Sequence, residues 1–203
     1  MEKLIENYLQ DAVAAFRNYK KMSEKAMAKV SEEEFFRRID HESNSIAIIV
    51  KHIAGNQRSR WTNFLTTDGE KDDRHRDGEF EILDDNRESL MKQWETGWKT
   101  LFRALESLTP REFSKTVTIR GESHTIFEAI NRQLTHYAYH VGQIVFLAKH
   151  FCAGEWKSLS VPKGRSAEFN EFLATKRAEG KSKTHPLEGV TEFSEERESG
   201  VDR

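Results

Sequence analysis

Four long segments of this 203-residue chain repeat their apolar residues in the three- and four-residue steps of an α-helix. Proline interrupts helices, and none occurs before Pro110, so the first half of the chain permits long helices. The periodicity predicts helices over about 3–29, 44–65, 86–108 and 126–151. We therefore expect an all-α fold, a four-helix bundle with long crossover connections.

Three shorter patterns lie between these segments. Ser31 followed by Glu34 resembles a capping box and predicts a short helical turn. Residues 116–125 alternate on either side of a glycine turn, which predicts a small hairpin immediately before the last helix. The stretch 67–79 has no apolar side chain and is rich in charge, so we expect an exposed loop.

The regular pattern weakens after about residue 153. We expect one domain over residues 1–155 and a C-terminal segment over 156–177 that packs on the bundle. Beyond it, residues 178–203 are rich in Gly, Lys, Ser and Glu with few large apolar groups, which predicts a mobile tail.

Composition limits the class of function. The chain is 36% apolar and 33% charged, with a net charge of −2 that favours neither nucleic acid nor an anionic membrane. The only cysteine, Cys152, excludes an intrachain disulfide. No segment reaches the ~18 unbroken apolar residues of a membrane span, and the N-terminus does not resemble a signal peptide. We expect a cytoplasmic protein that binds a small molecule, without nucleic acid or membrane partners.

Three histidines stand out on two of the predicted helices. His136 and His140 form an HxxxH pair, and residues four apart on a helix share one face, about 6 Å apart along the axis. His52 lies on an earlier helix where that face changes from isoleucines to polar residues. Two imidazoles from one helix and a third from another can bind one divalent cation and leave a position open, as in catalytic metal sites.

A structural interpretation of the histidines also stands. An HxxxH pair can be incidental, and a histidine among isoleucines can be a hydrogen-bonded core residue. Spacing alone does not decide between the two. Under the metal interpretation, neutral imidazoles suit Zn or Ni, with Fe and Cu as further choices. Three nearby polar residues, Asn56, Ser59 and Gln143, are then candidates for a substrate pocket.

The sequence around these histidines resembles a known family. The segments 44–56 and 131–144, together with 118–122 and 156–162, are similar to the DinB superfamily of damage-inducible and YfiT-like metal-binding four-helix bundles. Within it, the closest resemblance is to a branch of uncharacterised bacterial proteins, DUF1572. The similarity covers about residues 1–175 and implies an up-up-down-down bundle whose metal is held by His52, His136 and His140.

The resemblance also carries functional expectations. Better-known relatives include thiol S-transferases that use bacillithiol or mycothiol and a mycothiol-dependent isomerase. It therefore implies a divalent-metal-dependent enzyme that transfers a low-molecular-weight thiol to an electrophile in stress or detoxification. The alternative is a non-catalytic metal- or ligand-binding stress protein. The family is frequently dimeric, and the apolar surface expected from Trp61, Trp94 and Trp98 also predicts a homodimer.

Overall fold

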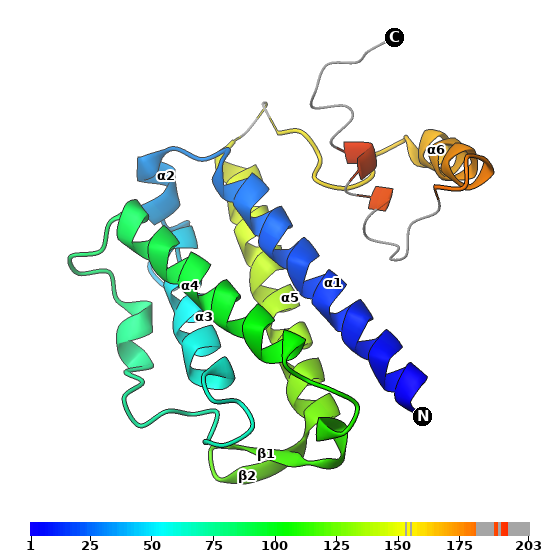
Figure 1. Cartoon of the computed structure of the whole chain (residues 1–203). Helices are drawn as coiled ribbons and strands as arrows, with labels where there is room; N and C mark the ends of the chain where they lie inside the picture. Colours follow the sequence, from blue (N-terminus) through cyan, green and yellow to red (C-terminus); the bar gives the residue numbers. More distant parts are fainter. Residues whose placement is uncertain (153, 155, 182–188, 191, 195–203) are drawn as a thin grey trace.

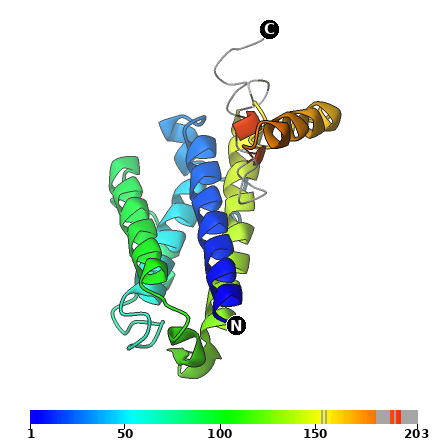
Figure 2. The same ribbon diagram turned by 45° about the vertical axis from the view of Figure 1, so that its right-hand side comes forward.

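Four long helices form the body of the computed structural model, which describes residues 1–203 except 153, 155, 182–188, 191 and 195–203. Helices α1 and α5 run in one direction, whereas α3 and α4 run in the opposite direction (Figures 1 and 2). The order along the chain is therefore up-down-down-up, and the up-up-down-down order that the resemblance implied is wrong. The closest helix pairs are α3 with α4 and α1 with α5. The predicted predominance of helix is confirmed. The four helices, called the bundle below, are α1 (Glu2–Met27), α3 (Ile46–Trp61), α4 (Arg87–Glu106) and α5 (Ile126–Phe151).

The predicted helix boundaries hold except for those of the second helix. Helix α3 begins later than expected because Ser45 caps it, its hydroxyl accepting a hydrogen bond from the backbone N–H of Ile48. It ends at Trp61, short of residue 65, and Asn63 then adopts a left-handed φ of 51° that stops the helix. In the part of the chain that the structure describes, no helix is long and apolar enough to cross a membrane.

Short elements connect the long helices, and two of them were predicted. The capping box of Ser31 and Glu34 is present, and the antiparallel hairpin before α5 is confirmed. Its turn places Arg120 and Gly121 at positive φ. The short elements are α2 (Glu32–Phe36), η1 (Asp77–Phe80), η2 (Glu112–Ser114), β1 (Thr116–Ile119) and β2 (Glu122–Thr125).

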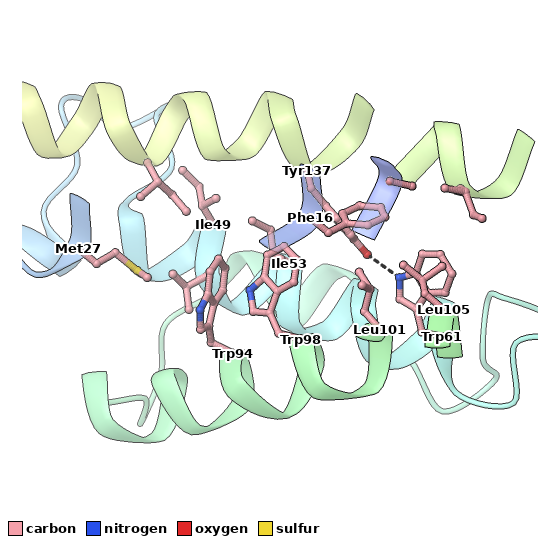
Figure 3. Packing of buried hydrophobic residues seen from close by; sticks show 14 of the residues in the cluster. Phe16, Met27, Ile49, Ile53, Trp61, Trp94, Trp98, Leu101, Leu105 and Tyr137 are labelled. Atoms are coloured by element: carbon pink, nitrogen blue, oxygen red, sulfur yellow. Dashed lines mark hydrogen bonds between the residues drawn. The ribbon is translucent and has the colours of Figure 1, made fainter. Parts of the chain in front are cut away.

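Aromatic side chains fill the centre of the bundle (Figure 3). Phe16 of α1 contacts the ring of Tyr137 of α5, with 5.7 Å between ring centroids. Trp61, Trp94 and Trp98 are at most 2% exposed. The tryptophans are therefore core residues of a single chain, and the argument for a homodimer from their exposed surface is wrong. The homodimer itself stays a prediction.

The crossover from α3 to α4, residues 62–86, is more buried than the sequence predicts. It runs back along the bundle because the two helices that it joins are parallel (Figure 1). Asp68 accepts hydrogen bonds from the backbone N–H groups of Arg120 and Gly121, both at 2.8 Å, which ties the crossover to the hairpin. Glu79 is only 7% exposed. The expectation of an exposed loop over 67–79 is wrong for Arg74 and Glu79, because these two charged side chains pair with each other and are buried as a pair.

The C-terminal segment lies partly on the bundle. Leu159 is buried and Trp156 packs against the core, whereas α6 (Ser166–Ala178) has no buried residue and lies apart from the long helices (Figures 1 and 2). Phe193 is buried against Phe169, with ring centroids 5.3 Å apart. Most of the predicted tail, 178–203, lies outside the described residues.

Replacing Tyr137 by Phe tests the polar contact within this core. The hydroxyl of Tyr137 accepts from Nε1 of Trp61 at 3.2 Å (Figure 3). It donates to Oδ1 of Asn56 at 2.9 Å. All three side chains are buried, so Tyr137→Phe would leave two polar groups unpaired and lower the free energy of unfolding by about 1–3 kcal/mol. Denaturant titration measures this. The matched control is Tyr139→Phe, at a residue 64% exposed, which should change the free energy of unfolding by less than about 0.5 kcal/mol. Equal losses in the two variants would show that the buried hydroxyl of Tyr137 does not stabilise the core.

Candidate metal centre

The three histidines selected from the sequence lie together between α3 and α5. One ring nitrogen from each of His52, His136 and His140 lies within 4.8 Å of the others. Nε2 of His136 is 3.2 Å from Nε2 of His52 and 3.1 Å from Nε2 of His140. The cluster could hold one metal ion.

The nitrogen spacing fits a small divalent ion. Two nitrogens bound at 2.0–2.1 Å to a tetrahedral ion are about 3.3–3.4 Å apart. Two of the three separations, 3.1 and 3.2 Å, are close to that value, and the third is at most 4.8 Å. A modest adjustment of side-chain torsions would therefore suffice for coordination.

Hydrogen bonds on the far side of two rings determine which nitrogens face the centre. Nδ1 of His52 donates to Oε2 of Glu79 at 2.9 Å, and Nδ1 of His140 donates to Oε1 of Gln143 at 2.8 Å. A neutral imidazole protonated on Nδ1 carries a lone pair on Nε2. Both lone pairs then face Nε2 of His136, whose single proton could satisfy only one of them. One cation would satisfy all three nitrogens, so the donor set fits a metal.

Burial favours the neutral form of two of the three histidines. Burial, together with the neighbouring His140 and His52, lowers the pKa of His136 to about 3. Burial also lowers the pKa of His140 to about 4, against the opposing effect of its hydrogen bond to Gln143. Metal binding requires unprotonated imidazole, so both ligands are ready to coordinate at neutral pH.

Glu79 is a functional residue that the sequence did not reveal. It contacts His52 and also accepts two hydrogen bonds from Arg74, both at 2.8 Å. Burial by itself raises the pKa of Glu79, but the hydrogen bonds from His52 and Arg74 outweigh it, and the pKa is lowered. The ionised carboxylate therefore orients the His52 ring, as partners of metal-binding histidines commonly do.

Gly55 makes room for that carboxylate. A Cβ at Gly55 would lie 2.7 Å from Cδ of Glu79 and closer still to Oε1, so no larger residue fits without displacing it. A glycine within a helix, three residues after His52, was the available signal of a close neighbour. The neighbour itself could not be identified, because 67–79 has the composition of an exposed loop.

The three predicted pocket residues have different surroundings. Asn56 lines a cavity beside His52 and His136. Ser59 is buried and holds the crossover: its hydroxyl donates to the carbonyl of Gly69 at 2.8 Å and accepts from the N–H of Lys71 at 3.0 Å. Gln143 binds Nδ1 of His140. Of the three, Asn56 has the place expected of a pocket residue.

The cavity beside the histidines has a volume of about 460 Å³. It opens on the side of the cluster formed by His52 and His136, where a ligand could approach the centre. Its lining is otherwise Asn56, Gln133, Thr135, Arg60, Arg74, Arg76, Arg120 and Arg132.

The family model for proteins of unknown function (DUF1572) matches residues 3–165. The chain belongs to the DUF1572 family. The matched region contains the whole bundle, the three histidines and Glu79. The predicted resemblance to this branch is confirmed. The chain has no significant match among curated proteins or among solved structures.

Replacing Glu79 by Gln tests its role in this DUF1572 protein. The variant keeps the size of the side chain but loses the negative charge that holds His52 and Arg74. We expect metal affinity to fall about 10–100-fold, as is typical when the partner of a ligating histidine is lost. Competition with a chromophoric chelator measures this affinity. The control Glu81→Gln changes an exposed residue of the same crossover, and equal affinities for the two variants would show that Glu79 does not orient the centre.

Proposed function

We propose that this DUF1572 protein is a divalent-metal-binding member of the DinB superfamily. The observation that carries the proposal is the convergence of three Nε2 atoms, two of which carry a lone pair when their rings are neutral because their Nδ1 atoms donate hydrogen bonds. Zn or Ni is the metal that we propose, with Fe or Cu as alternatives, because neutral imidazoles suit all four. The four-helix architecture and the sequence resemblance support the superfamily assignment. A cytoplasmic homodimer remains part of the proposal.

We further propose an enzymatic reaction, the transfer of a low-molecular-weight thiol to an electrophile. The cavity beside His52 and His136 gives a small molecule room next to the centre. A divalent ion held there would supply Lewis acidity and favour the thiolate form of a thiol. Cys152, the only cysteine, follows the C-terminal end of α5, and its Sγ donates to the carbonyl of Lys29. The thiol would therefore come from a small molecule.

The chain's own residues have positioning roles in this scheme. Glu79 holds His52, and Gln143 holds His140. Because the carboxylate of Glu79 is already bonded to His52 and to Arg74, it is not available as a general base. No carboxylate lines the cavity either, within the part of the chain that the structure describes. The lack of a free carboxylate to act as a general base favours the alternative function, a non-catalytic metal- or ligand-binding stress protein.

Loss of one ligand tests the metal site. We expect one ion per chain in protein purified without a His-tag, and we expect His140→Ala to lower the affinity for that ion by at least ~10–100-fold. The variant should remain helical because its apolar core supplies the folding energy. The wild type should melt at a higher temperature with metal than after chelation, since a ligand of the native state stabilises it. Elemental analysis and thermal unfolding measure these effects.

The control for this variant is His150→Ala, which changes an exposed histidine on the same helix. It should retain both the metal and the response to chelator. A wild type indifferent to chelator, together with full metal content in His140→Ala, would identify the three histidines as core residues and overturn the metal proposal.

A panel of thiols and electrophiles separates the two functions. We expect metal-loaded wild type to catalyse conjugation and His140→Ala to lose it, because the metal ligand is removed. Product formation is measured by mass spectrometry. Saturable thiol binding without product would favour the non-catalytic alternative.

A further inference from the structure

Among the residues that the structure describes, five arginines and no acidic side chain line the cavity beside the three histidines. The arginines come from parts of the chain that are distant in sequence: α3, the crossover, the hairpin turn and α5. A bundle surface normally mixes both signs of charge. The concentration of guanidinium groups at one cavity therefore calls for a specific explanation.

Two of these arginines are structural. The guanidinium of Arg60 bonds to Glu70 at 2.9 Å, and that of Arg74 bonds to Glu79 and Glu70. Both side chains are nearly inaccessible, at 6% and 2% exposed. Their charges are balanced by the buried Glu79 and the partly exposed Glu70, so these two arginines form the wall of the cavity but supply little free charge.

The other three arginines are exposed and poorly neutralised. Arg120 shares Glu70, at 3.3 Å, with the buried pair. Arg76 has Asp77 at 3.9 Å, but the side chain of that aspartate is 92% exposed and water screens the pair. Arg132 has no carboxylate within ion-pair distance among the residues that the structure describes. The exposed arginines of the cavity thus carry more positive charge than the carboxylates near them neutralise.

Asn56 adds a hydrogen-bond donor to the same cavity. Its Oδ1 accepts from Tyr137, so its amide N–H groups remain for the cavity that it lines. An amide donor at this position can bind an anionic oxygen.

We propose that this cavity binds the anionic group, a carboxylate or a phosphate, of the small molecule on which the protein acts. Planar guanidinium groups bind both anions through paired hydrogen bonds. The volume of about 460 Å³ lies in the range of small-molecule sites. The inference rests on the proposed function in one respect. If the histidines hold a metal ion, the arginines would bind the anionic group of the small molecule and leave its reacting part beside His52 and His136.

Calorimetric titration in low-chloride buffer tests the inference with two probes, inorganic phosphate and succinate. Wild type should bind at least one of them saturably, and the stronger of the two identifies the preferred anion; uncharged succinamide should not bind. Arg132→Gln should weaken binding about 10-fold, the loss expected for one charge-assisted contact. Arg38→Gln removes an exposed arginine that does not line the cavity and should leave binding unchanged.

The same titrations on His140→Ala separate this inference from the metal proposal, because His140 does not line the cavity. Saturable binding by the metal-depleted variant would support an anion site made by the arginines. Binding that is lost in His140→Ala but unchanged in Arg132→Gln would place the anion on the metal and overturn the inference. No binding by wild type, or equal losses in Arg132→Gln and Arg38→Gln, would also overturn it. Anion binding by wild type that also takes up no added metal would overturn the metal proposal alone.

Discussion

The contact of Glu79 with His52 and Arg74 is the interaction on which the candidate site depends. A buried carboxylate is stable only when it is paired and hydrogen-bonded, and Glu79 meets both conditions. Losing one partner of such a pair costs about 3–5 kcal/mol, because the other charge stays buried alone. The contact therefore holds the crossover against α3 and, through the same carboxylate, orients the ring of His52.

The topology of the bundle explains why a loop reaches this position. Since α3 and α4 are parallel, residues 62–86 have to return along the bundle between them (Figure 1). Asp68 and Ser59 hold the early part of this segment to the hairpin and to α3. These anchors position Arg74 and Glu79 beside the histidines. The crossover is long because the two helices that it joins are parallel, and the same segment supplies Arg74 and Glu79 to the site.

Sequence periodicity predicted the helices and the hairpin because each depends on neighbours in the chain. The histidines were found for a related reason: helical spacing places His136 and His140 on one face, and burial on α3 follows from the isoleucines beside His52. The roles of Glu79 and Ser59 depend on contacts with distant segments. Their composition matches that of an exposed charged loop or a polar helix face, so periodicity carried no signal of their burial.

The charge at the three histidines and the charge at the arginine-lined cavity affect each other. Three neutral imidazoles leave the charge of a divalent ion uncompensated, and the one carboxylate behind them, Glu79, is shared with Arg74. The arginines at the cavity would by themselves oppose a cation. An anion in the cavity would reverse that field, so metal and anion should each favour binding of the other by the same factor. An anion bound in the cavity beside the histidines would therefore offset the repulsion between the arginines and a cation at the histidines.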